Sequence, residues 1–129
     1  MHKSIKNFED INKELNLKVK VNSLPKIIAV SKTFPISEIM PLIEYGHVHF
    51  GENKVQEAVD KWSEVKIKYP DIKLHLIGKL QTNKVKFAVK CFDYIHSIDN
   101  EKLAKKIADE QIKQSKNIKL FIQVNIGNE

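Results

Sequence analysis

The sequence predicts an α/β protein with a parallel sheet, and three observations support this. Short apolar runs rich in Ile and Val recur along the chain, and segments of helical periodicity separate them. Their order is one helix, four strand–helix units and a fifth strand, and strands that alternate with helices pair in parallel. The starts of the apolar runs lie roughly 20–26 residues apart, which is typical of the units of a (β/α) barrel. A five-stranded open α/β sheet is the alternative architecture.

Five apolar runs are the predicted strands. Each has the length and the β-branched or aromatic content of a buried strand. They cover residues 26–31, 47–51, 72–78, 92–98 and 118–126.

Apolar residues at helical spacing predict the helices between these strands. One helix precedes the first strand, and others follow the first four strands. The segment 35–46 ends at Gly46, and Pro41 inside it is expected to kink the helix or delay its start. Thr82 is a plausible N-cap of the fourth of these segments. The apolar positions are Ile5, Phe8, Ile11 and Leu15; Val55, Ala58, Val59, Trp62 and Val65; Val85, Ala88, Val89 and Phe92; and Leu103, Ala104, Ile107, Ala108 and Ile112.

Composition favours one globular domain of 129 residues, with 42% hydrophobic and 29% charged residues. No apolar run approaches the roughly 20 residues that span a bilayer, and the N-terminus lacks a signal-peptide core. We therefore expect a cytoplasmic protein that does not associate with a membrane. The single cysteine, Cys91, is interpreted as a small buried hydrophobic residue.

The net charge of +6 raises the question of a nucleic-acid or other polyanionic partner. All 22 basic residues are lysines, whereas nucleic-acid readers depend on arginine for bidentate contacts. Lysines also alternate with acidic residues along the predicted helices. A solvated lysine-rich surface is therefore the preferred interpretation, and polyanion binding is the alternative.

Several polar residues follow the ends of predicted strands. In parallel α/β folds the carboxyl ends of the strands form one rim, and that rim carries the chemistry. Lys32, Asn53, the Ile77–Gly78 turn, Ser97 and Asp99 could converge there. A lysine in this place can act as a nucleophile, and a Schiff base with an aldehyde is its characteristic product. A solvated lysine at the start of a loop is the competing interpretation.

The histidines suggest a second kind of site. His47 and His49 share one face of a strand, and His75 and His96 lie near the ends of the next two strands. Histidines from several barrel strands can bind a metal ion, but no HExxH-type helix or clear carboxylate ligands accompany them. Packed, hydrogen-bonded histidines are the preferred interpretation. No glycine-rich phosphate loop and no G-x-S-x-G motif occurs in the chain.

Five stretches of the sequence resemble the pyridoxal phosphate homeostasis proteins, in the family's order and over nearly the whole chain after about Pro25. They are IIAVSKTFP, GHVHFGENKVQEAVDKW, KLHLIGKLQTNKVK, IHSIDNEKLAKKI and LFIQVNIGNE. The family is similar in fold to the N-terminal barrel of alanine racemase. The resemblance thus implies that residues 1–129 are a single domain, the N-terminal portion of a (β/α)8 barrel with about five of the eight strands.

The resemblance also implies a cofactor, pyridoxal 5'-phosphate, and the residues that bind it. Lys32 in AVSKT would hold the cofactor as a Schiff base, Asn53 in GEN would line the pocket, and Ile77 in LIG would pack near the pyridine ring. Val30 would flank the lysine, and its equal strand parity places it on the same face. The implied function is pyridoxal phosphate homeostasis without established turnover. His75 would be a hydrogen-bonding residue that lines the barrel.

Two alternatives remain open. A racemase-like enzyme would need an acid–base residue opposite the lysine, for which Tyr45, Tyr69 and Tyr94 are candidates by type. The other is a truncated fragment without function. The family's phosphate-binding serine, glycine and threonine, and its arginine facing the pyridine nitrogen, would lie beyond Glu129. We therefore expect a fragment of a longer protein, which would be a monomer at full length; a half-barrel completed by association is a further alternative.

Overall fold

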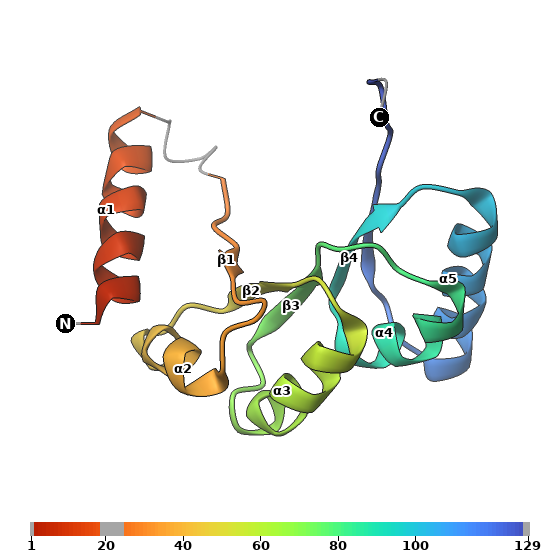
Figure 1. The fold of residues 1–129 in the computed structure, drawn as a ribbon, viewed down its shortest axis with the longest axis horizontal. Helices are drawn as coiled ribbons and strands as arrows, with labels where there is room; N and C mark the ends of the chain where they lie inside the picture. The colour runs from red at the N-terminus through yellow and green to blue at the C-terminus, as the bar shows by residue number, and fades with distance from the viewer. Residues whose placement is uncertain (1, 19–24, 128–129) are drawn as a thin grey trace.

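The computed structural model describes residues 2–18 and 25–127, and a parallel sheet of five strands forms the centre of this part of the chain (Figure 1). The strands lie side by side in sequence order, and each pairs in parallel with the next. The predicted α/β class and the predicted order of strands are confirmed. The strands are β1 (Ala29–Val30), β2 (His49–Glu52), β3 (Lys73–Leu76), β4 (Tyr94–Ile98) and β5 (Lys119–Ile122).

The two outer strands are shorter than the apolar runs that predicted them. β1 contains only Ala29 and Val30, although the N–H of Ser31 still donates to the carbonyl of Gly51 at 3.0 Å. β5 ends at Ile122, and Gln123 adds one further hydrogen bond, to the carbonyl of Ile98 at 2.7 Å. Each of these strands has only one neighbour in the sheet, so half of its backbone groups lack a strand partner.

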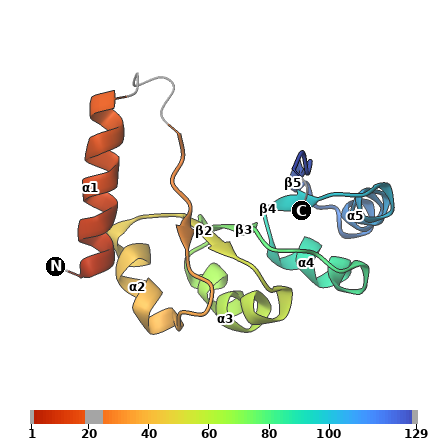
Figure 2. The ribbon, with the colours of Figure 1, turned by 45° about the horizontal axis from the view of Figure 1, so that its top comes forward.

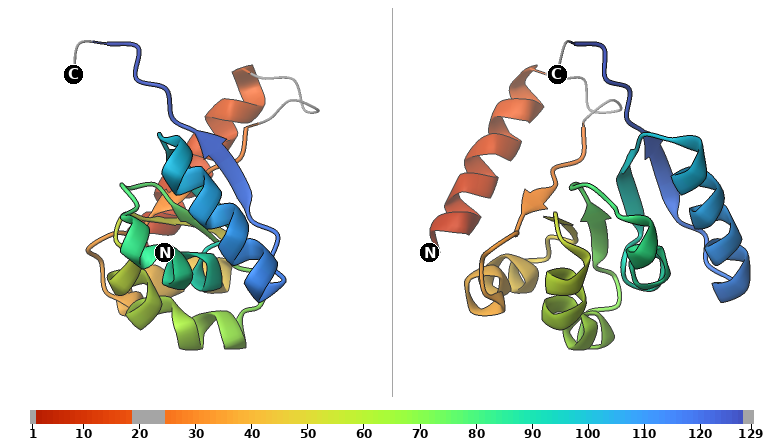
Figure 3. Two further views of the ribbon diagram at one scale, coloured as in Figure 1. Left: turned by 90° about the vertical axis from the view of Figure 1, so that its right-hand side faces the viewer. Right: turned by 45° about the vertical axis from the view of Figure 1, so that its right-hand side comes forward.

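The helices α2 to α5 follow one another along one side of the sheet, as Figures 1 and 3 show. Figure 2 shows α1 beside α2, at the end of the sheet where β1 lies. This succession of units is that of a (β/α) barrel opened along one side. The helices are α1 (Lys3–Lys18), α2 (Ile36–Tyr45), α3 (Val55–Lys68), the 3-10 turn η2 (Thr82–Lys84), α4 (Val85–Cys91) and α5 (Glu101–Gln114).

Helix ends agree only partly with the sequence signals. Gly46 ends α2 in the left-handed region, at φ 110°, as predicted. The expected delay at Pro41 is wrong, because α2 begins at Ile36 and includes the proline. Thr82 is not an N-cap: it opens η2, and α4 begins only at Val85. The side chain of Asn100, by contrast, caps α5 by accepting the N–H of Leu103 at 2.8 Å.

The core lies between the sheet and the helices. Phe50, Leu74, Leu76 and Ile95 leave alternate positions of the central strands toward the helices and are fully buried. Phe50 packs on Trp62 of α3 with ring centroids 5.0 Å apart. Burying each large apolar side chain contributes about 1.5–3 kcal/mol, so this layer accounts for much of the stability.

Some positions of the predicted apolar faces are exposed, among them Ile11, Ala108 and Ile112. Leu103 and Ile107 of α5 are buried, but Ile112 is 79% exposed. At 3.6 residues per turn, Ile112 lies nine positions and therefore two and a half turns after Leu103, on the opposite side of the helix.

Cys91 ends α4 and is buried, as its interpretation as a hydrophobic residue predicted. Burial raises the pKa of its thiol to about 11. Within residues 2–18 and 25–127 no helix has the length and apolar character needed to cross a bilayer.

Candidate functional site

Lys32 lies in the turn that follows β1, two residues after Val30. Val30 is paired with Gly51 of β2, so these two residues share a face. We call this face, which the helices leave uncovered, the inner face, and Val30 on it precedes Lys32 by two residues. Both side chains are exposed to solvent. The lysine amine is therefore accessible at the carboxyl end of the first strand.

Ile77 reaches the inner face from the end of β3. A β-carbon built on Gly51 would lie 3.1 Å from Cγ2 of Ile28 and 3.2 Å from Cδ1 of Ile77. Two branched side chains, one from the residue before β1 and one from the residue after β3, thus meet over the glycine that separates them. Any side chain at position 51 would push them apart.

Asn53 and Gly78 bring the loops after β2 and β3 into contact. A β-carbon on Gly78 would lie 2.7 Å from Cβ and 2.8 Å from Cα of Asn53, so only glycine fits there. The N–H of Ile77 donates to the carbonyl of Glu52 at 2.9 Å and extends the pairing to this point. The side-chain oxygen of Asn53 is buried, and it has no hydrogen-bond partner among the described residues. Such a buried acceptor is suited to a polar ligand.

Ser97 lies near the end of β4, where the register with β5 shifts between Ile95 and Ile98. Its side chain is buried, and its hydroxyl has no hydrogen-bond partner among the described residues. Asp99 is exposed after β4 and accepts a hydrogen bond from Asn100 at 3.0 Å. Lys32, Asn53 and Ile77 therefore follow the ends of three adjacent strands.

A buried carboxylate lies behind the lysine, on the helix side of the sheet. Glu52 is fully buried and accepts hydrogen bonds from the hydroxyl of Ser31 and from the indole N–H of Trp62. Its charge is balanced by Lys61 of α3, whose Nζ lies 3.1 Å away. The same Nζ donates to the carbonyl of Ser31 at 2.9 Å. This network ties α3 to the residue that precedes Lys32.

A second acidic residue of α3 holds the residue that follows Lys32. The backbone N–H of Thr33 donates to Oε1 of Glu57 at 2.7 Å, and this hydrogen bond lowers the pKa of the Glu57 carboxyl. Glu57 also pairs with Lys61 at 3.3 Å. Thr33 has φ 66°, in the left-handed region that β-branched residues rarely adopt.

The inner face also carries a row of aromatic and imidazole rings, one layer below the rim. Nδ1 of His49 lies 2.9 Å from Nε2 of His75, and Nδ1 of His75 lies 2.9 Å from Nε2 of His96. Tyr94 stacks on His75 with centroids 4.1 Å apart, and Phe121 stacks on His96 at 4.6 Å. Because these ring nitrogens bond to one another, the row matches the expectation of hydrogen-bonded histidines that line a barrel.

The electrostatics of the row favour neutral rings. Burial is the largest of the causes that lower the pKa of His75 to about 4, and the neighbouring His96 and His49 act in the same direction. Burial also lowers the pKa values of His47, His49 and His96. In the described part of the chain no three His, Cys, Asp or Glu side chains are arranged to hold a metal ion.

The three tyrosines lie away from the lysine end of the sheet. Tyr45 ends α2 and its hydroxyl donates to Glu9 at 3.1 Å, while Tyr69 is the C-cap of α3. Tyr94 is on the inner face but begins β4, at the opposite end of the strand from the rim.

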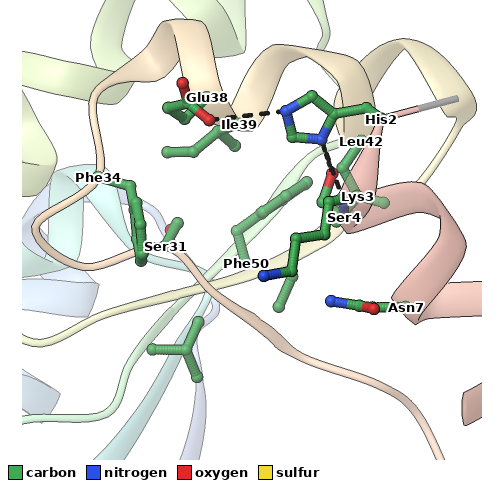
Figure 4. A pocket seen from close by; sticks show the side chains of 12 residues that line it. His2, Lys3, Ser4, Asn7, Ser31, Phe34, Glu38, Ile39, Leu42 and Phe50 are labelled. Carbon is green, nitrogen blue, oxygen red and sulfur yellow. Dashed lines mark hydrogen bonds and ion pairs between the residues drawn. The ribbon is translucent and has the colours of Figure 1, made fainter.

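A separate cavity of about 390 Å³ opens between the start of α1, β1 and α2 (Figure 4). His2 and Glu38 form an ion pair at its mouth, 3.6 Å apart. Val30, Ser31 and Phe50 line it, but Lys32, Asn53 and Ile77 do not. This cavity therefore adjoins β1 and does not include the three residues that follow the strand ends.

Sequence analysis missed the residues that surround the lysine on the helix side. Glu52, Glu57 and Lys61 were not identified as site residues. One local signal was present, because Glu57 and Lys61 are four positions apart in a predicted helix, the spacing of a side-chain ion pair.

Parallel strands in sequence order, helices on one face, and a lysine, an amide and an isoleucine at adjacent strand ends define part of a (β/α)-barrel protein with its candidate site at the rim. The chain belongs to the alanine racemase N-terminal domain family, whose model matches residues 11–129. The fold class and family that the sequence resemblance implied are thereby confirmed.

Similar curated proteins carry the name pyridoxal phosphate homeostasis protein. The Buchnera aphidicola protein is 41% identical over 127 residues, which cover 95% of this chain and 55% of that protein. The Vibrio alginolyticus protein is 39% identical over 106 residues, which cover 81% of this chain and 46% of that protein. The chain thus spans about half the length of the curated relatives it matches.

Solved structures give the same picture. PipY of Synechococcus elongatus without pyridoxal phosphate superposes with a TM-score of 0.85 at 36% identity, covering 96% of this chain and 54% of PipY. PipY with pyridoxal phosphate bound superposes with a TM-score of 0.81 at 37% identity, covering 93% and 55% of the two chains.

Proposed function

We propose that this chain is part of a protein of pyridoxal phosphate homeostasis and that it binds pyridoxal 5'-phosphate through Lys32. The observation that carries the proposal is an accessible lysine at the end of β1 in a chain similar to PipY, which has been solved with this cofactor. The chemistry is a reversible Schiff base. The neutral amine of Lys32 would condense with the aldehyde carbon, so that a C=N bond replaces the C=O bond and the oxygen leaves as water in exchange for the two amine hydrogens.

The neighbouring residues have distinct parts in this proposal. Asn53 offers a buried side-chain oxygen that has no other partner among the described residues, and it would bind a polar group of the cofactor. Ile77 presents an apolar side chain on the inner face and would pack against the pyridine ring. Val30, two residues before Lys32, would flank the bond to the lysine. The fit supports the lysine side of a cofactor pocket.

The proposal assigns no phosphate-binding group to residues 1–129, because the chain spans about half the length of its relatives. We infer that the groups that hold the phosphate belong to a longer protein, of which residues 1–129 would be one domain. Cytoplasmic location and the lack of a nucleic-acid partner remain predictions from composition, and a monomer at full length remains a prediction as well. Turnover is not part of the proposal, and the racemase-like alternative would need a rim tyrosine, whereas Tyr94 begins its strand.

Titration with pyridoxal phosphate, followed by absorbance of the Schiff base, tests the proposal. Lys32→Ala should abolish the saturable absorbance band. Lys79→Ala is the matched control, because Lys79 is also exposed and follows the next strand end but one. An unchanged band in Lys32→Ala would show that another lysine holds the cofactor. Loss of the band in both variants would show that the signal does not report a single site.

A further inference from the structure

We propose that Glu57, together with the buried Glu52–Lys61 pair, positions Lys32 for its reaction by fixing the residues on either side of it. Ser31 precedes the lysine and is hydrogen-bonded to Glu52, and Thr33 follows it and is hydrogen-bonded to Glu57. The inference rests on the proposed function of Lys32 and adds residues that do not touch the cofactor.

Both the side chain and the backbone of Ser31 are fixed by hydrogen bonds. The Ser31 hydroxyl donates to the fully buried Glu52 carboxylate, and the Ser31 carbonyl accepts a hydrogen bond from Lys61 at 2.9 Å. Only 9% of the Lys61 side chain is exposed, and its Nζ also lies 3.1 Å from Glu52. Charge-assisted hydrogen bonds away from water are stronger than neutral ones, so this residue has little freedom to move.

The hydrogen bond to Glu57 offsets the unfavourable backbone conformation of Thr33. A β-branched residue at φ 66° is strained, and such a conformation persists only where its surroundings enforce it. The 2.7 Å hydrogen bond from the Thr33 N–H to Glu57 is the contact that enforces it here. A second bond, from the N–H of Phe34 to the carbonyl of Ser31 at 3.2 Å, closes the turn around Lys32.

Lys32 lies in the turn between these two held residues, and its side chain is exposed. The lysine amine has no hydrogen bond or ion pair within the part of the chain that the structure describes. Its backbone is thus fixed by α3 while its amine stays available, which reduces the ordering that must accompany bond formation.

The three charged residues differ in how safely they can be replaced. Removing Lys61 leaves the buried Glu52 charge without a partner, and removing Glu52 empties a fully buried position, so either change risks unfolding. Glu57 is the better target, because its side chain is 30% exposed. Glu64, an exposed acid on the same helix, provides the control with the same change of charge.

Two measurements on Glu57→Ala test the proposal. Amide hydrogen exchange of Thr33 reports the turn itself, without any cofactor. The second uses limiting pyridoxal phosphate and sodium borohydride, which reduces the C=N bond and leaves the label on the lysine that formed it. Peptide mapping then gives the share of label on Lys32 among the 22 lysines. The melting temperature is recorded for every variant.

We expect Glu57→Ala to lose protection at Thr33 and to lower the share of label on Lys32 at least threefold, at a nearly unchanged melting temperature. Glu64→Ala should match the wild type. Glu57→Gln should restore part of both signals, because its amide oxygen can still accept the Thr33 N–H. The positioning role is overturned if the Thr33 amide of Glu57→Ala stays protected from exchange. It is also overturned if that protection is lost while the share of label on Lys32 stays the same.

The proposed function fails in a different way. If the wild type itself shows no preference for Lys32, the cofactor assignment is wrong. In that case the exchange data still decide whether Glu57 fixes the turn.

Discussion

His49 and His75 share a hydrogen bond of 2.9 Å across β2 and β3, and His75 continues the row to His96 with a second bond of equal length. A neutral imidazole has one donor and one acceptor nitrogen, so a row of neutral rings satisfies both bonds when all donors point the same way. A protonated His75 would have two donors, which reverses one of these bonds. Folding therefore favours the neutral form.

This preference predicts a dependence of stability on pH. The pKa of His75 is lowered to about 4 in the folded chain, below its ordinary value of 6.5, so the unfolded chain binds the extra proton first as the pH falls. The stabilising effect should be complete above about pH 6.5 and lost between 6.5 and 4. Urea unfolding from pH 4 to 8 should show a decrease of about 2–3 kcal/mol, since one pKa unit equals about 1.4 kcal/mol.

His75→Asn should flatten the pH profile. The charged and titratable groups that act on this ring come from several elements: His49, His96, Asp93 and Lys26. Asp93→Asn is the matched check, because removing an acid that favours protonation should steepen the loss. A wild-type profile that is flat between pH 4 and 6.5 would refute the assignment.

Gly78→Ala should damage both the fold and the site. Its β-carbon would overlap the backbone and side chain of Asn53, so the two loops must separate, at a cost of about 1–3 kcal/mol or more. Gly46→Ala is the control: its φ of 110° makes alanine strained there, but no atom lies within 4 Å of the new carbon. We expect urea unfolding to show destabilisation in both variants. Only Gly78→Ala should also weaken the pyridoxal phosphate band.

The affinity for pyridoxal phosphate should be low in this chain. Each charge-assisted hydrogen bond to a phosphate contributes about 1.5–3 kcal/mol, so two missing bonds would weaken binding about 100-fold or more. Spectroscopic titration of this chain beside the Buchnera relative, which is nearly twice as long, measures the difference. Equal affinities for the two proteins would show that residues 1–129 bind the phosphate unaided.

The outer strand β5 should promote self-association of this chain. Phe121 is 50% exposed and Ile122 is 77% exposed, beside an unpaired strand edge. Ile122→Lys should reduce the mass measured by light scattering at high concentration. Ile67→Lys, at a position 82% exposed on α3, should leave it unchanged. A chain that stays monomeric at all concentrations would contradict this prediction.

Strand order and the two faces of the sheet could be predicted because they depend on local patterns. Alternation assigns Leu74 and Leu76 to one side, and helical spacing assigns Ala58 and Trp62 to the core. Ile112 shows the limit of that method, since one apolar residue extended the pattern half a turn too far. The site residues Lys32, Asn53 and Ile77 came from strand-end position and from resemblance, and their roles stay predictions.

The network behind Lys32 could not be predicted in the same way. In the sequence, Glu52 is a polar residue at the end of a predicted strand, and no local sequence pattern shows that its side chain is fully buried. Its partner Ser31 is 21 positions away in the sequence, so the contact exists only once β1 and β2 have paired. The left-handed turn at Thr33 is equally hidden, because threonine is a poor indicator of such a turn.

The reactivity of the Cys91 thiol can report how often the core of the chain opens. This is the one thiol in the sequence, it is enclosed at the end of α4, and its raised pKa keeps it protonated at neutral pH. A thiol reagent can therefore react only when the core opens. The rate of labelling at Cys91 would rank every variant described above by its opening free energy, in native buffer and without denaturant.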